Sequence, residues 1–203
     1  MRGWARAGLA LAIAAAAVPA AGQNSFSSRT SPGEAFLKAV TDGDNAAAVP
    51  MIKEPGSRVV NYKGYDGETA LHIVTRKRKL DWVGFLLNNG ANPSIPDSKG
   101  DTALHVAARM GFDQAAVYMI EEGARIDADN RAGETPLTLA VQANQPRMVE
   151  LLLAAGANPD KGDHVAGLSP RDYAKRNSRN PQLLKLIETV KATKKKVAGP
   201  SLN

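Results

Sequence analysis

Short apolar segments recur in pairs along the chain, and a polar turn separates the members of each pair. The first member contains Leu with small residues, as at 103–108, and the second is more apolar, as at 149–155. Apolar side chains at this spacing share one face of a helix. Gly156 directly follows the second segment, at a position where glycine commonly ends a helix. The pattern therefore predicts a unit of turn, helix and helix.

This unit repeats at a fixed interval. The segment Gly-Asp-Thr-Ala-Leu-His-Val-Ala-Ala begins at Gly100, and near copies begin thirty-three residues earlier at Gly67 and thirty-three later at Gly133. Weaker copies begin at Gly33 and Gly167, each thirty-four residues from its neighbour. The chain thus contains five predicted units, of which three are complete and the two at the ends are degenerate.

The repeated positions have simple local reasons. Glycine opens each unit where a turn delivers the chain to a helix, a place that favours positive φ or a close backbone approach. Two residues later a hydroxyl side chain can cap the helix, at Thr69, Thr102, Thr135 and Ser169. Pro136 and Pro170 follow two of these caps, at the first helical position, where no backbone donor is needed.

The complete units resemble the ankyrin repeat, whose period is 33 residues and whose signature is Gly-x-Thr-Pro-Leu-His-x-Ala. The ending Gly-Ala-Asn, at 90–92 and 156–158, is also similar. The resemblance covers residues 31–191 and implies an all-α fold, an ankyrin-repeat solenoid of about five helix-turn-helix units. Turns would project at one edge, the first helices would line a concave face, and neighbouring units would supply each other's core.

The end units depart from this pattern. In the first, at 34–53, apolar residues are expected to face inward and Pro50 to interrupt the second helix. In the last, Arg171-Asp172 replaces Leu-His and one extra residue follows Asp163, which is typical of a solvent-facing cap. Residues 192–203 are expected to be a basic disordered tail.

The beginning of the chain has the features of an export signal. A basic head at 1–6 precedes an apolar run at 7–18, which is too short for a membrane span of roughly 20 residues. We expect residues 1–22 to be a signal peptide cleaved near Ala20 or Gly22, and 23–30 to be a flexible leader. An uncleaved anchor or a buried helix is the alternative. The signal predicts a periplasmic or secreted protein without stable membrane insertion.

Composition limits the chemistry further. Among 203 residues only 5% are aromatic and none is cysteine, so the core depends on Leu, Ala, Val and Ile, and disulfides and cysteine-ligated metals are excluded. No nucleophile elbow, phosphate loop, His-Glu-x-x-His or paired catalytic carboxylate pattern is present. We therefore expect no enzymatic activity, no catalytic residue and no cofactor.

The three histidines are candidate metal ligands. His72 and His105 occupy the same position in successive units, and the resemblance implies a structural role in which each imidazole binds turn backbone and ties adjacent units together. His164 is near Asp160 and Asp163, a spacing that suits a loosely held cation or ordinary turn hydrogen bonds. We assign no metal ligand.

Basic clusters offer two further alternatives. The segment Arg76-Lys77-Arg78-Lys79 departs from the family, which usually has glycine near Arg78; it could contact nucleic acid, but a solvated turn is the preferred interpretation. Lys194-Lys195-Lys196 could touch anionic lipid, which would make the chain an envelope-associated structural protein.

The preferred function is an exported protein–protein interaction module. The resemblance places the residue seven positions after each cap on the concave face, and there the chain is rich in arginine. The predicted partner-binding residues are Tyr65, Arg76, Lys77, Lys99, Arg109, Met110, Arg131, Gln142 and Arg176. They are expected to receive an acidic segment of an envelope or periplasmic protein, with no nucleic acid, on a monomeric chain. Alternatively, Glu68, Asp101 and Glu134 pair with the arginines in a self-contained charge ladder.

Overall fold

The computed structural model describes residues 31–178 and 180–197, with side chains described up to Thr189. The predicted signal peptide, the leader and residues 198–203 lie outside the described residues. Within them the expected all-α solenoid of five units is confirmed. Its helices are α1 (Pro32–Asp42), α2 (Asn45–Lys53), the 3₁₀ helix η1 (Val59–Asn61), α3 (Ala70–Arg76), α4 (Leu80–Asn88), α5 (Ala103–Met110), α6 (Asp113–Glu121), α7 (Pro136–Gln142), α8 (Pro146–Ala154), α9 (Pro170–Arg176) and α10 (Gln182–Val197).

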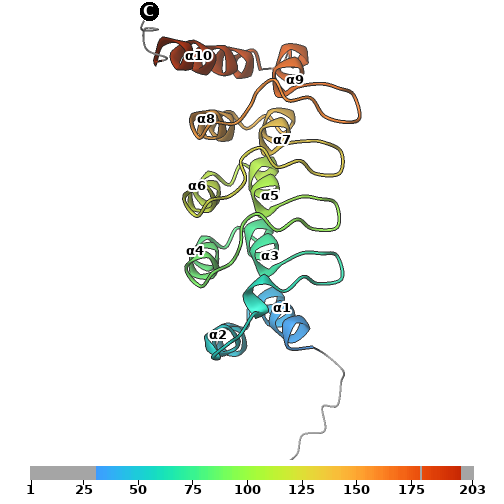
Figure 1. Ribbon diagram of the computed structural model, residues 1–203, viewed down its shortest axis with the longest axis vertical. Helices are drawn as coiled ribbons and strands as arrows, with labels where there is room; N and C mark the ends of the chain where they lie inside the picture. Colours follow the sequence, from blue (N-terminus) through green and yellow to red (C-terminus); the bar gives the residue numbers. More distant parts are fainter. Residues whose placement is uncertain (1–30, 179, 198–203) are drawn as a thin grey trace, which may run out of the picture.

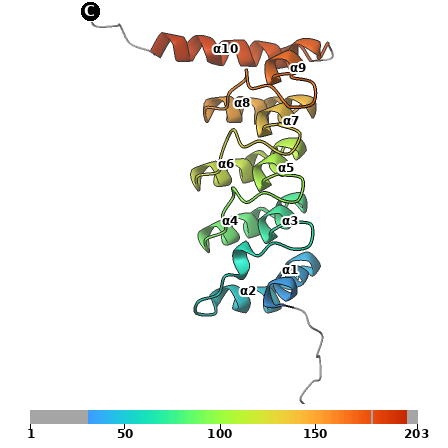
Figure 2. The ribbon, with the colours of Figure 1, turned by 45° about the vertical axis from the view of Figure 1, so that its right-hand side comes forward.

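The helices form two stacked columns (Figures 1 and 2). The inner column contains α1, α3, α5, α7 and α9, and the outer column contains α2, α4, α6, α8 and α10. Helices pack against the members of the neighbouring unit in the same column, as α5 does against α7 and α4 against α6. Each unit therefore buries its apolar faces against its neighbours, as repeat architectures require.

The core follows the apolar pattern of the sequence. Leu104 and Leu137 on the inner helices and Leu152 on α8 are fully buried, and complete burial of such a side chain stabilises by about 1.5 to 3 kcal/mol. Fully buried alanines such as Ala107 and Ala116 let neighbouring helices approach closely. At the end of the stack, α10 covers the last unit by burying Leu183 and Ile187, and an atypical final helix of this kind is expected of a capping unit.

Turns between units project from the inner column as four fingers, at 63–68, 96–101, 129–134 and 162–168 (Figure 1). Backbone hydrogen bonds connect successive fingers: Ser98 N–H donates to the carbonyl of Asp66 at 2.8 Å, and Arg131 N–H donates to that of Lys99 at 2.9 Å. The third and fourth fingers are joined in the same way by His164 and Ala132 at 2.8 Å. The fingers thus form one continuous edge of the solenoid.

Two boundaries differ from the sequence-based expectation. Helix α2 continues through Pro50 to Lys53, so the predicted interruption is wrong. Proline removes a single helical hydrogen bond, and both Pro50 and Ala46, whose carbonyl loses its donor, are exposed to water. At the other end α10 runs to Val197, past the predicted limit at 191. Lys and Ala are good helix formers, and no strong helix breaker occurs before Gly199-Pro200.

The basic turn before α4 has packing roles that the sequence did not predict. Arg78 takes the left-handed conformation with φ 54°, at the position where the family usually has glycine. Its guanidinium lies 4.7 Å from the Phe112 ring centre and donates to the Met110 carbonyl at 3.0 Å. Lys77 reaches the Thr41 carbonyl of the preceding unit. Two of the four basic side chains therefore join units, and a cation over a ring contributes about 0.5 to 1 kcal/mol at exposed sites.

Candidate functional site

The inner helices are held in register by buried histidines. His105 is completely buried; its Nδ1 accepts from the Thr102 N–H at 3.0 Å, and its Nε2 lies 3.1 Å from the Glu134 carbonyl. Since Nδ1 accepts, the proton is on Nε2, which donates to the next unit. Burial lowers the pKa of His105 and also that of His72, which makes the same bonds to Thr69 and Asp101. The expected structural role of both histidines is confirmed.

The arginines of the inner helices are paired with the acidic row. Arg76 donates two hydrogen bonds to Glu68, and Arg109 Nη2 donates to Asp101 at 2.9 Å. The side chain of Asp101 is only 4% exposed, whereas that of Arg109 is 49% exposed. Burial opposes ionisation of Asp101, but hydrogen bonds from Asn130 and Arg109 lower its pKa. Two rungs of the alternative charge ladder are therefore present.

Glu134 stands apart from these rungs. It accepts from Asn130 Nδ2 at 3.0 Å, and the residue that occupies the arginine position in its unit is the uncharged Gln142. Asn130 donates from the same nitrogen to Asp101 at 2.9 Å, so it links the carboxylates of two successive units. This link was not predictable from the sequence, because Asn130 and Asp101 are twenty-nine residues apart along the chain.

Two adjoining hollows lie between the inner helices and the fingers. The first, of about 380 Å³, is lined by Tyr65, Arg76 and Lys77 over the apolar side chains of Leu37 and Ile73. Tyr65 is fully exposed at its rim. Leu37 is partly buried: it packs against the hydrophobic core and also lines this hollow.

The second hollow, of about 540 Å³, is lined by Lys99, Arg109 and Met110 and shares Arg76 with the first. It also contains four carboxylates, those of Asp66, Glu68, Asp97 and Asp101. The structure thus brings together six of the nine predicted partner-binding residues. The surface of the second hollow is of mixed charge, because Asp66 and Asp97 line it beside Lys99 and Arg109. The predicted partner-binding residues do not include these two aspartates.

The other three predicted residues line neither hollow. Arg131 is exposed on the third finger, and Gln142 and Arg176 are exposed at the ends of α7 and α9. Gln142 and Arg176 share the register of the inner-helix row but lie in later units, whereas Arg131 belongs to a finger. Sequence register gives the position of Gln142 and Arg176 along their helices, but it does not show where the surface is hollowed.

The acidic residues near His164 are engaged in local contacts. Asp163 accepts three backbone N–H groups of its own finger through Oδ1, and through Oδ2 it accepts from the Tyr173 hydroxyl at 2.6 Å. Hydrogen bonds from Tyr173 and from the finger overcome the effect of burial and lower the pKa of Asp163, and the same bond raises the pKa of Tyr173. Asp160 forms an ion pair with Arg171 at 2.6 Å. Within the described part of the chain, no group of three His, Asp or Glu residues is arranged to hold a metal ion.

Comparison with known proteins gives one family. A model described as ankyrin repeats (3 copies) matches residues 36–130 and again 96–163, and the two matches together span more than half of the chain. No curated protein shows significant sequence similarity to it. The matched residues include all three complete units and both hollows. The chain therefore belongs to the ankyrin-repeat family and is built as a protein–protein interaction module.

Proposed function

We propose that this ankyrin-repeat protein is exported and that its concave face binds a segment of an envelope or periplasmic protein. The observation that carries the proposal is the grouping of Tyr65, Arg76, Lys99 and Arg109 around two adjoining hollows between the fingers and the inner helices. The ankyrin family is typically non-enzymatic, so the proposed activity is binding by a single copy of the chain, without a cofactor.

Arg109 is the strongest candidate for polar recognition. Its pairing with Asp101 uses Nη2, while a guanidinium has five N–H donors in a fixed planar arrangement. The nearly buried carboxylate holds the arginine in one orientation, which reduces the entropy lost when a partner binds. A carboxylate of the partner can then accept from the remaining donors.

Tyr65 supplies the apolar part of the surface. It is fully exposed and borders a hollow that Leu37 and Ile73 also line. Tyrosine is enriched among residues that dominate binding energies, because it buries a large area with little loss of side-chain entropy. An aliphatic or aromatic side chain of the partner would fill this hollow.

The mixed charge of the surface narrows the kind of segment that fits. Asp66 and Asp97 line the second hollow together with Lys99 and Arg109, so a run of acidic residues would meet repulsion as well as attraction. We therefore propose a segment with one carboxylate directed at Arg109 and Lys99 and one apolar side chain directed at Tyr65. This proposal accommodates the charge ladder, since neither existing ion pair must be broken.

The clean test is the double substitution Tyr65→Ala with Lys99→Glu. Both side chains are exposed, and among the described residues neither side chain forms a hydrogen bond or an ion pair, so the fold should be unaffected. We expect the variant to lose most of the partner recovered by crosslinking from an envelope extract, with a weaker dependence on salt. Lys185→Glu, an exposed charge reversal on α10, is the control and should bind as the original protein does.

Equal recovery by the folded double variant would place the interface elsewhere. Arg109→Glu is unsuitable as the main test, because it puts a second carboxylate beside buried Asp101 and would lower stability as well as binding.

Export is proposed from the basic head and apolar run that precede the described residues. The mature protein is expected to begin near Ala21 or Gln23 and to be recovered in the periplasmic fraction or the medium, which intact-mass measurement can establish. Within the described residues no helix has both the length and the apolar character needed to cross a membrane. A full-length chain recovered with membranes would show instead that the first segment is an uncleaved anchor.

A further inference from the structure

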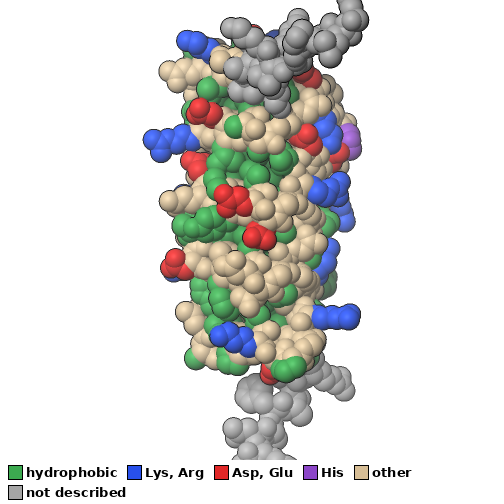
Figure 3. Space-filling view, turned by 60° about the vertical axis from the view of Figure 1, so that its left-hand side comes forward, with side chains coloured by type: hydrophobic (Ala, Val, Ile, Leu, Met, Phe, Trp, Pro, Cys, Tyr) green, Lys and Arg blue, Asp and Glu red, His purple; other side chains and the backbone are tan. Residues whose placement is uncertain are grey.

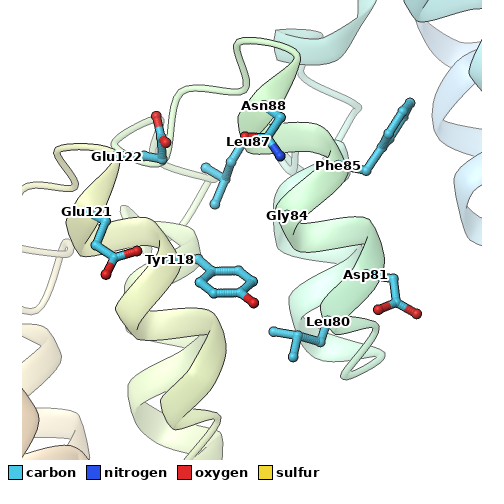
Figure 4. A pocket seen from close by; sticks show the side chains of 9 residues that line it. All are labelled: Leu80, Asp81, Gly84, Phe85, Leu87, Asn88, Tyr118, Glu121 and Glu122. Atoms are coloured by element: carbon cyan, nitrogen blue, oxygen red, sulfur yellow. The ribbon is translucent and has the colours of Figure 1, made fainter.

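A further hollow, separate from the two on the concave face, lies between the outer helices α4 and α6 on the opposite side of the solenoid. It has a volume of about 460 Å³ and is lined by Leu80, Gly84, Leu87 and Tyr118, together with acidic residues (Figure 4). In Figure 3, which turns the outer helices toward the viewer, hydrophobic side chains occupy the spaces between them and acidic side chains lie beside these bands. We call this surface the α4/α6 groove.

The groove exists because of one small residue and one large one. Gly84 has no side chain, whereas the residues one and two units later are Val117 and Glu150. Tyr118 projects from α6 toward this gap (Figure 4), and a Cβ at Gly84 would lie 3.5 Å from its ring. Tyr118 as a whole residue is nevertheless 41% exposed. An aromatic side chain that is half in contact and half open is typical of binding surfaces.

The charges of the groove are all of one sign. Asp81, Glu121 and Glu122 line it, and no Lys or Arg does, although the chain as a whole has a net charge of +6. Among the described residues none of these three carboxylates takes part in an ion pair. This arrangement is complementary to a basic ligand.

Two of the carboxylates also stand where they do not help the fold. Glu121 is the last residue of α6 and Glu122 is its C-cap, and the negative end of a helix dipole disfavours anions at this position. Local sequence rules are most often broken at functional sites. The stability of the helix therefore does not explain why Glu121 and Glu122 stand at this position. A positively charged group of a bound partner would explain it.

We propose that the α4/α6 groove binds a basic amphipathic segment of a partner protein, with an aliphatic or aromatic side chain against Tyr118 and Lys or Arg beside Glu121, Glu122 and Asp81. The site is separate from the concave face, so the chain can hold two partners at once. An apolar anchor gives affinity, and the flanking charges give orientation and a fast, salt-dependent encounter.

A short fluorescent helical peptide of leucine and lysine is the probe, and its binding is measured by fluorescence anisotropy. The charge reversal Glu121→Lys with Glu122→Lys is expected to weaken binding at least about tenfold, because attraction becomes repulsion. Tyr118→Ala is expected to weaken it by a similar factor at high salt as at low salt, since this contact is apolar. Lysines at the end of α6 suit the helix dipole, so the charge-reversed variant remains folded.

The matched control is Glu54→Lys with Glu150→Lys, which changes the net charge equally at exposed positions outside the groove. It should bind the peptide as the original protein does, and so should Tyr65→Ala with Lys99→Glu, which alters only the concave face. Peptide-induced NMR shifts are expected on α4 and α6.

No binding of the peptide, or equal loss in the control, would overturn the proposal. A concentration-dependent dimer that is abolished by the groove substitutions would do so as well, because it would assign the groove to a second copy of the chain. The peptide experiment does not depend on whether the concave face binds a partner. Failure of one proposal therefore leaves the other standing.

Discussion

Replacing Gly100 by alanine is expected to reduce the free energy of unfolding by about 2 to 5 kcal/mol. Gly100 has φ +83°, a conformation that costs a residue with a side chain about 1 to 2 kcal/mol. An added Cβ would also lie 2.7 Å from the backbone nitrogen of Arg131 in the next finger. Relief of that contact requires the hydrogen-bonded fingers to separate, which adds the second part of the loss.

Gly90→Ala is the matched control for this prediction. Gly90 has the same φ of +83°, but no atom lies within 4 Å of a Cβ built there. We expect this variant to lose only the conformational part, about 1 to 2 kcal/mol. Urea unfolding followed by circular dichroism measures both variants. Equal losses would mean that the close approach of the fingers contributes nothing, contrary to the prediction.

Replacing His105 by alanine is expected to reduce the free energy of unfolding by about 2 to 4 kcal/mol. The substitution leaves a cavity, and it removes the buried partners of the Thr102 N–H and the Glu134 carbonyl. His164→Ala, which alters an exposed finger residue, is the control and should change stability by less than about 0.5 kcal/mol.

The chain itself suggests how to separate the two roles of His105. Thr138 occupies the equivalent position in the next unit, where it forms a capping box with Thr135. None of its described hydrogen bonds reaches a neighbouring unit. His105→Thr should therefore keep the cap and lose the bond between units, at a cost of about 1 to 2 kcal/mol. A loss as large as that of His105→Ala would mean that the cap is not restored.

The same histidine contributes to the pH dependence of stability. An exposed imidazole has a pKa of about 6.5, and burial lowers the pKa of His72 and His105 in the folded chain. The unfolded chain thus binds protons more readily, so this contribution is complete above about pH 6.5 and decreases as the pH falls below it. The urea concentration at the unfolding midpoint should decrease as the pH is lowered from about 7 to about 5, and it should decrease less in His105→Thr. A pH-independent midpoint would contradict the assignment of neutral, buried imidazoles.

The lowered pKa values of Asp101 and Asp163 act in a different range. Their stabilising contribution is complete above the ordinary aspartate pKa of about 3.9 and is lost only as the pH falls further. The loss of stability caused by protonation of these carboxylates is therefore distinguishable from the loss caused by protonation of the histidines.

The sequence by itself determined the architecture: the number of units, the order of helices and the caps that begin them. These features depend on interactions within a few residues, such as the reciprocal hydrogen bonds of Thr102 and His105. The same local signals recur at a period of thirty-three residues. The row of inner-helix residues was predictable for the same reason, because a helix fixes the register of Arg76 or Arg109 relative to its cap.

Only the tertiary structure decided which side chains meet. Asn130 bridges Asp101 and Glu134, Arg78 covers Phe112, and Tyr118 faces Gly84, all through contacts between different units. Such contacts depend on the rise and rotation from one unit to the next. This rise and rotation are set by the hydrogen-bonded backbone of the fingers and by the small residues of the core. The repeat pattern shows only the residue types that every unit has in common. The hollows and the acidic groove are formed by residues at positions where the units differ.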